Sequence, residues 1–190
     1  MKEYAALTHA LLASGARVAQ PAMPRVTLDD PAYSVMTDLS LQHAAITYPD
    51  ESADRAHALM LERGVRLLFA IDRDGSLAGV ITATDLLGDK RMRVMQERGF
   101  AHHRELRVTD LMTPAASLEA IPYAEVAQMR VGHLVATLRS VRRQHLLVSE
   151  RDGALVRGII SASRIARQLG LQLESFEIAS TFADIEAALR

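Results

Sequence analysis

The stretch GVITATD, residues 79–85, decides the fold, because the closely similar stretch GIISASR occurs at residues 158–164. The two heptads begin with Gly, continue with β-branched residues and carry a hydroxyl residue at the fourth position. They differ in charge at the last position, which is Asp85 in the first and Arg164 in the second. A near repeat at this distance indicates that one supersecondary unit has been duplicated.

The sequence on either side of each heptad repeats as well. Helical spacing of apolar residues occurs at 52–64 and again at 132–143, so each segment predicts a helix with one buried face. The segments LLFAIDRDGSLAGVIT (67–82) and HLLVSERDGALVRGIIS (145–161) each place two apolar runs around Asp-Gly, which predicts a hairpin. A helix should begin after each hairpin. The sequence therefore predicts a mixed α/β (α+β) fold of two strand–helix–strand–strand–helix (β-α-β-β-α) repeats.

Each repeat spans only about 60 residues, which is too few to bury a stable core alone. We therefore expect the two pseudo-symmetric repeats to pack through their sheets. The charged stretch between them has helical spacing, and Ser180–Asp184 contains a helix start with Thr181 as the cap. The expected organisation is an N-terminal arm or short helix, a first repeat, a connecting helix, a second repeat and a tail helix, at residues 1–30, 31–90, 91–107, 108–170 and 171–190.

Composition excludes several classes of protein. The 190 residues carry 22 Lys and Arg against 23 Asp and Glu, so no basic surface for nucleic acid is indicated. The absence of Cys rules out disulfides and thiolate chemistry. No apolar run reaches the roughly 18 residues of a membrane helix. The N-terminal segment is a poor match to a secretory leader, so a soluble cytoplasmic protein is expected.

The repeat resembles the cystathionine-β-synthase (CBS) domain, which occurs in tandem pairs called Bateman modules. The resemblance covers roughly residues 31–170. It rests on the hairpins, on the starts Val35-Met36-Thr37 and Leu111-Met112-Thr113, and on the heptad pattern G-h-x-[ST]-x-x-D. The first copy matches the heptad in full, and the second matches it up to its final residue.

The resemblance implies a regulatory protein with no catalytic activity and no required cofactor. CBS pairs bind AMP, ADP, ATP or in some cases S-adenosylmethionine between their repeats, form flat homodimers and report to an effector protein. No effector domain is visible, so the chain would be a stand-alone pair. The alternative is a ligand-free scaffold that only dimerises and presents its Met- and Arg-rich helices to other proteins.

Thr82 and Asp85 are the best-matched site residues. Physically, Thr82 stands where a strand ends and a helix begins, and Thr-x-x-Asp is a capping box that satisfies free backbone N–H groups. A helix start also favours phosphate. The resemblance implies in addition that Asp85 binds the ribose hydroxyls and Thr82 a phosphate, with Thr84 as a further candidate. A capping function alone explains Thr82 and Asp85 as well.

The second repeat should complete the cleft of the first. By resemblance, residues 121–127 correspond to a strand whose backbone meets the adenine edge, which makes Pro122 and Ala127 candidates. Residues 143–148 correspond to a strand that approaches phosphate and forms an apolar wall, which makes His145 and Leu147 candidates. Core packing explains Ala127, His145 and Leu147 equally well. Leu147 replaces the proline that is usual in this strand, as Phe69 does in the first copy, so the wall has an altered shape.

Arg164 predicts that only one nucleotide binds per chain. A ribose diol needs a hydrogen-bond acceptor, and a guanidinium group has donors only. We expect Arg164 to fill the second cleft, to contact a phosphate of the ligand in the first, or to form a surface salt bridge.

Other candidate sites are weaker. The adjacent histidines His102 and His103 point in different directions on a helix, and no third ligand stands at metal-binding spacing. No nucleophile elbow or phosphate-binding loop occurs. Two basic clusters, at residues 90–98 and 139–143, are typical of solvated helix faces. Alternatively, Arg142 or Arg143 completes a polyphosphate site, and the first cluster docks an acidic partner.

Overall fold

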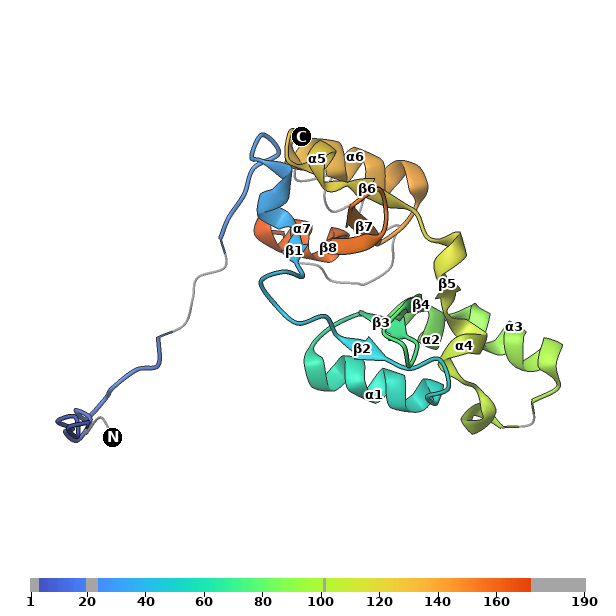
Figure 1. Cartoon of the computed structure of the whole chain (residues 1–190), viewed down its shortest axis with the longest axis horizontal. Helices are drawn as coiled ribbons and strands as arrows, with labels where there is room; N and C mark the ends of the chain where they lie inside the picture. The colour runs from blue at the N-terminus through green and yellow to red at the C-terminus, as the bar shows by residue number, and fades with distance from the viewer. Residues whose placement is uncertain (1–3, 20–23, 101, 172–190) are drawn as a thin grey trace.

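The structure is a computed structural model that describes residues 4–19, 24–100 and 102–171. The expected tail helix, apart from Leu171, lies outside the described residues. Residues 4–19 form no helix or strand and extend away from the rest of the chain (Figure 1), with their large apolar side chains exposed. None of the helices in the described ranges has the length and hydropathy needed to cross a bilayer.

The body of the molecule consists of two similar halves, each with a four-stranded sheet and helices that cover one of its faces (Figure 1). The predicted repeat of strand, helix, strand, strand and helix is present in both. The first half contains β2 (Ile46–Thr47), α1 (Ala53–Arg63), β3 (Leu67–Ile71), β4 (Leu77–Thr82) and α2 (Ala83–Leu87). The second contains β6 (Ala120–Pro122), α5 (Tyr123–Val126), α6 (Val131–Val141), β7 (His145–Glu150), β8 (Leu155–Ser161) and α7 (Ala162–Gln168).

The remaining elements connect the halves. A 3-10 turn η1 (Ala32–Val35) leads into β1 (Thr37–Asp38), and helix α3 (Asp89–Arg98) follows α2. After α3 come η2 (His103–Glu105), α4 (Val108–Leu111), β5 (Thr113–Pro114) and η3 (Ala115–Ser117).

The two halves exchange their first strands. The sheet orders are β2-β3-β4-β5 and β1-β8-β7-β6. Strand β1, which lies near the start of the first predicted repeat, pairs antiparallel with β8 of the second half. Strand β5, which lies near the start of the second predicted repeat, pairs antiparallel with β4 of the first half. The sequence repeat alone did not predict this exchange, because the motifs around Thr37 and Thr113 read as the starts of their own repeats.

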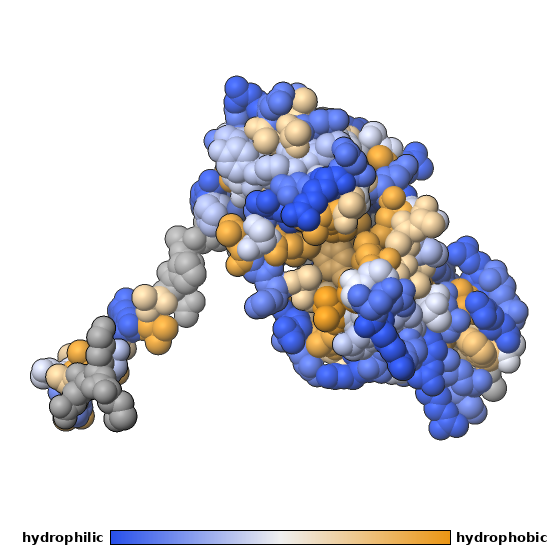
Figure 2. Space-filling model, in the orientation of Figure 1, coloured by the Kyte–Doolittle hydropathy of each residue, from blue (hydrophilic) through white to orange (hydrophobic). Residues whose placement is uncertain are grey.

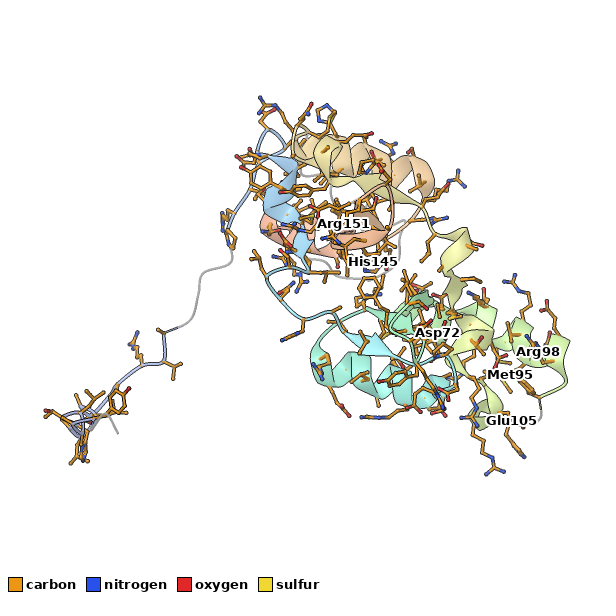
Figure 3. The ribbon with its side chains drawn as sticks, viewed as in Figure 1. Asp72, Met95, Arg98, Glu105, His145 and Arg151 are labelled. Carbon is orange, nitrogen blue, oxygen red and sulfur yellow. The ribbon has the colours of Figure 1, made fainter. Side chains whose placement is uncertain are left out.

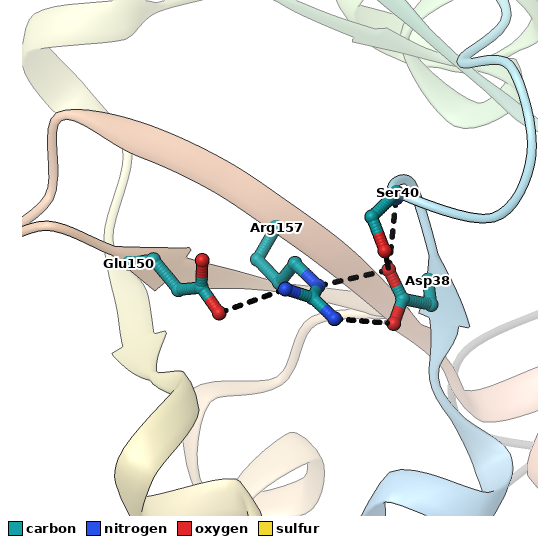
Figure 4. Close-up of polar contacts among 4 residues, drawn as sticks. All are labelled: Asp38, Ser40, Glu150 and Arg157. Carbon is teal, nitrogen blue, oxygen red and sulfur yellow. Dashed lines mark hydrogen bonds and ion pairs between the residues drawn. The ribbon is translucent and has the colours of Figure 1, made fainter.

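An arginine clamp holds β1 in the second sheet (Figure 4). The guanidinium of Arg157 on β8 donates two hydrogen bonds of 2.9 Å to the carboxylate of Asp38 and one of 2.9 Å to Glu150. The same guanidinium lies 5.0 Å from the ring centre of Tyr123. These bonds, together with those from Ser40, lower the pKa of Asp38 well below its usual range. A bidentate pair of this kind specifies the orientation of both side chains.

Backbone hydrogen bonds attach residues 26–30 to the second half. The amide of Val26 donates to Gln168 O at 3.0 Å, and Leu28 O accepts from the amide of Gly132 at 2.9 Å. Asp30 O accepts from the amide of Val131 at 2.9 Å. The last part of the N-terminal segment therefore packs on the body, beside α6 and α7.

Three apolar clusters stabilise the fold. One lies between the first sheet and its helices and includes Met60, Ile81 and Leu86. A second lies between the other sheet and its helices and includes Leu138 and Ile165. The third joins the two sheets, and its buried members are Leu67, Phe69, Val80 and Leu147. The prediction that the repeats pack through their sheets is confirmed.

Candidate functional site

A cleft of about 300 Å³ lies between the two halves and is lined by residues of both. Figure 2 shows apolar surface gathered in the hollow between the halves, with polar side chains on the outer helices. The apolar part of the lining comes from Leu67 and Val80 in the first half and from Leu118, Val141, Leu146 and Leu147 in the second. Polar residues, among them Thr84, Asp85 and Arg142, also line the cleft, so it has the mixed character of a small-molecule site.

The first half contributes Thr82, Thr84 and Asp85 to the lining. The capping box predicted from the sequence is present. The carboxylate oxygen Oδ2 of Asp85 accepts from Thr82 N at 2.9 Å and from Thr82 Oγ1 at 2.7 Å, and Asp85 N donates to Thr82 Oγ1 at 3.3 Å. The hydroxyl of Thr82 and the amide of Asp85 are thus engaged locally. Of the Asp85 side chain, 16% remains exposed.

The other carboxylate oxygen of Asp85 is held by Lys90. Lys90 Nζ lies 2.9 Å from Asp85 Oδ1 and also donates to the carbonyl oxygen of Leu111 at the end of α4. Sequence reasoning assigned Lys90 only to a basic cluster. Side chains on one face of a helix are three or four positions apart, whereas Asp85 and Lys90 are five apart and lie in different helices on either side of Gly88. Their ion pair therefore depends on the direction in which α3 leaves α2.

The second half contributes arginines and a histidine. Arg142 ends α6 in the left-handed conformation, at φ 52°, and lines the cleft together with Arg143. Arg143 forms an ion pair of 3.7 Å with Glu119, another lining residue. Both arginines are exposed, and among the described residues Arg142 has no ion pair. This end of the cleft can therefore receive an anionic group.

His145 lies where the second sheet faces the first (Figure 3) and lines the cleft. Burial lowers the pKa of His145 from 6.5 to about 4; the positive charge of Arg66 adds to the effect and the negative charge of Asp85 opposes it. The imidazole is therefore neutral at pH 7, with one donor and one acceptor nitrogen.

The structure brings together five of the seven site residues expected from the sequence. Thr82, Thr84, Asp85, His145 and Leu147 all line the cleft.

Pro122 and Ala127 lie away from it. Pro122 pairs with Ser149, two positions beyond Leu147 along β7, and there the chain leaves the sheet to begin α5. The side chain of Val126 packs in the cluster on the helix side of the sheet, and Ala127 is exposed at the end of α5. Leu118 and Glu119, the two residues just before β6, line the cleft instead of Pro122 and Ala127.

Arg164 occupies the position in the second half that Asp85 occupies in the first. Its guanidinium donates a 3.0 Å hydrogen bond to Thr37 Oγ1. Thr37 is the counterpart of Thr113, which lines the cleft beside Asp85. The half-buried Arg164 therefore reaches within its own half to the exchanged strand β1.

The basic cluster at residues 90–98 makes contacts within the chain. Arg91 pairs with Asp54 of α1 at 2.7 Å, and Arg98 pairs with Asp110 of α4 at 3.6 Å. With Lys90 bound to Asp85, three cations of this cluster are paired. Among the described residues, no group of three or more His, Cys, Asp and Glu side chains is arranged to hold a metal ion.

Comparison with known proteins agrees with this fold. A family model described as CBS domain matches residues 29–89. No curated protein matches the sequence.

Similar solved structures include an uncharacterized conserved protein from Pyrococcus horikoshii, with a TM-score of 0.55 at 20% identity over 80% of this chain and 100% of that chain. The structure of CBSX2 in complex with AMP has a TM-score of 0.52 at 23% identity, over 73% and 94% of the two chains. The CBS domain pair of protein MJ0100, in complex with 5′-methylthioadenosine and S-adenosyl-L-methionine, has a TM-score of 0.53 at 15% identity, over 75% and 97%. Residues 29–89 therefore match the CBS domain, and the chain has the fold of a CBS domain pair.

Proposed function

We propose that this protein is a regulatory module that binds one adenine nucleotide per chain and has no catalytic activity of its own. The observation that carries the proposal is the cleft between the halves, which combines an apolar wall, the carboxylate of Asp85 and the guanidinium groups of Arg142 and Arg143. A ribose requires hydrogen-bond acceptors, a base requires an apolar slot, and a phosphate requires cations.

The similar structures support an adenine-containing ligand. CBSX2 was crystallised with AMP, and the MJ0100 pair with 5′-methylthioadenosine and S-adenosyl-L-methionine. In our proposal the ribose lies against Asp85, the base lies between Leu67 and Leu147, and the phosphates point to Arg142 and Arg143. A cleft of about 300 Å³ is at the lower end of the volumes of ligand sites, which favours a mononucleotide.

Regulation would follow from the position of the cleft. A ligand that contacts both halves binds some arrangements of the halves better than others and so shifts the conformational equilibrium. We propose that an effector protein, or the second chain of a homodimer, responds to this shift.

Titration calorimetry with AMP, ADP, ATP and S-adenosylmethionine tests the proposal, after any co-purified nucleotide has been removed. We expect one site per chain. Asp85→Asn should weaken AMP binding by about tenfold or more, because a charged acceptor is lost. The matched control is Asp74→Asn, since Asp74 likewise accepts from a nearby Ser76 N and Oγ, at 2.9 and 2.7 Å, but lies in an exposed hairpin.

The arginines distinguish the nucleotides. If phosphates reach Arg142, then Arg142→Ala should weaken ATP binding more than AMP binding, whereas Arg73→Ala, at a side chain 94% exposed, should change neither. Arg164→Ala should leave the stoichiometry at one.

A ligand-free scaffold remains the second candidate, because Thr82 and Lys90 already satisfy much of the Asp85 carboxylate. Absence of heat with all four ligands, together with a dimer in sedimentation measurements, would establish the scaffold and refute the nucleotide site.

A further inference from the structure

The carboxylate of Asp85 has almost no acceptor capacity left for a ligand. A carboxylate offers about four lone-pair positions. Thr82 N and Thr82 Oγ1 occupy two of them on Oδ2, and Lys90 Nζ occupies a third on Oδ1. A ribose diol presents two hydroxyl groups, so it can bind Asp85 through both only if one of these donors leaves.

Lys90 is the donor that can leave. The amide and hydroxyl of Thr82 belong to the capping box at the start of α2, and their removal would disrupt the strand-to-helix turn. The Lys90 side chain is 30% exposed, extends from a different helix and can be solvated by water when it moves. A ligand diol therefore competes with the Lys90 ammonium group.

The internal repeat supports a paired role for Asp85 and Lys90. In the second copy, the residue 79 positions after Asp85 is Arg164. The residue 79 positions after Lys90 is Leu169, which directly follows α7. Leu169 packs against the apolar cluster of its half. The half that lacks the carboxylate thus also lacks the ammonium group, and Lys90 is one of only two lysines in the sequence, with Lys2.

Lys90 also connects the cleft to helix α3. It lies in the first turn of α3, and its second contact, with the Leu111 carbonyl, ties α3 to α4 just before Thr113, which lines the cleft. Helix α3 has no buried residue. Apart from the partly buried Val94 and Met95, it is held by polar contacts of Lys90, Arg91 and Arg98 rather than by buried apolar side chains. Figure 3 shows Met95 and Arg98 on this outlying helix.

We propose that Lys90 is an internal counter-ion of the nucleotide site: the ligand diol displaces it from Asp85, and its release loosens α3 from the first half. This inference rests on the proposed function and adds an output to it. Occupancy of the cleft is converted into a change at the connecting helix, where a partner can detect it.

The test compares AMP affinity and hydrogen exchange in the full-length wild type, Lys90→Met and Lys90→Gln. If Lys90 competes with the ligand, Lys90→Met should bind AMP about three- to tenfold more tightly, although a cation has been removed from the neighbourhood of a phosphate ligand. Lys90→Gln keeps a neutral donor for the Leu111 carbonyl, so its AMP affinity should lie between those of wild type and Lys90→Met. This variant serves as the test if Lys90→Met folds poorly. Arg93→Met removes an exposed charge from the same helix and should leave affinity unchanged.

Hydrogen exchange gives the second reading. Amides of residues 89–98 should exchange faster in wild type with AMP than without it, and already faster in ligand-free Lys90→Met.

Each outcome decides the inference. Tighter AMP binding by Lys90→Met supports it, including when wild type binds too weakly to measure. Equal or weaker binding by Lys90→Met, or exchange in α3 that AMP does not change, overturns it while the nucleotide site stands. Absence of binding in every variant refutes the nucleotide site, and the inference with it.

Discussion

His145 is a histidine that the cleft keeps neutral. It occupies the first position of β7, opposite Ser161, while the equivalent position of β3 is Leu67. Among charged groups, Arg66 lowers its pKa and Asp85 raises it, but burial is the largest influence and brings it to about 4. A neutral imidazole in this place can donate to or accept from a ligand without adding a charge.

This pKa predicts that acid destabilises the protein. Between pH 6.5 and 4 the unfolded chain binds a proton at His145 that the folded chain does not bind, so the free energy of unfolding falls as the pH is lowered through this range. The full effect would be about 3 kcal/mol, and partial exposure of the side chain reduces it to about 1–2 kcal/mol. Urea unfolding from pH 7 to pH 5 should show a flatter pH dependence in His145→Gln than in wild type.

The exposed His43 provides the control, and His43→Gln should follow wild type. Asp38, whose pKa lies below its usual range, loses its contribution only as the pH falls below about 4, outside the measured range. Parallel curves for wild type and His145→Gln would show that His145 is protonated equally in both states.

At the scale of elements, the exchanged strands depend on two glycines. A Cβ at Gly79 would lie 2.4 Å from the Thr113 carbonyl oxygen, and a Cβ at Gly158 would lie 2.6 Å from Met36 Sδ and 2.9 Å from the Thr37 carbonyl oxygen. The heptads thus begin with Gly because β5 and β1 approach their backbones closely.

Gly79→Ala should therefore lower the free energy of unfolding by about 1–3 kcal/mol, since the nearest atom is backbone and cannot rotate away. Gly132→Ala in α6 is the matched control, because its Cβ would meet nothing closer than 3.5 Å. In a helix, that change should be neutral or stabilising by up to about 1 kcal/mol. Chemical denaturation measures both, and equal stabilities of the two variants would contradict the role of Gly79.

At the scale of the whole molecule, strand exchange and the shared core make each half depend on the other. The inter-sheet cluster takes Leu67, Phe69 and Val80 from one half and Leu147 from the other. Separation would expose this surface and remove an edge strand from each sheet. The cleft exists only while the halves are together, since both line it.

We therefore expect the full chain to unfold in one cooperative thermal transition, and a fragment of residues 1–107 not to fold stably. A fragment of residues 1–119, which restores β5, should recover part of the helical signal and melt at a lower temperature than the full chain. Circular dichroism and calorimetry measure this. A cooperative transition of fragment 1–107 near that of the full chain would show that the halves fold independently.

Local sequence patterns predict much of the architecture. The repeat, helices α1 and α6, both hairpins, the capping box of Thr82 and Asp85 and the altered charge at Arg164 all follow from patterns within short segments. Caps, turns and apolar periodicity act between residues a few positions apart, so the order of the chain records them directly.

Other features depend on how the elements pack against one another. Three of them emerge only in the tertiary structure. These are the exchange of β1 and β5, the lining of the cleft by Leu118 and Glu119 rather than Pro122 and Ala127, and the pairing of Lys90 with Asp85. Each depends on how sheets and helices pack after the local elements have formed. Caps, turns and apolar periodicity do not encode such contacts, because these contacts are set by the relative orientation of whole elements.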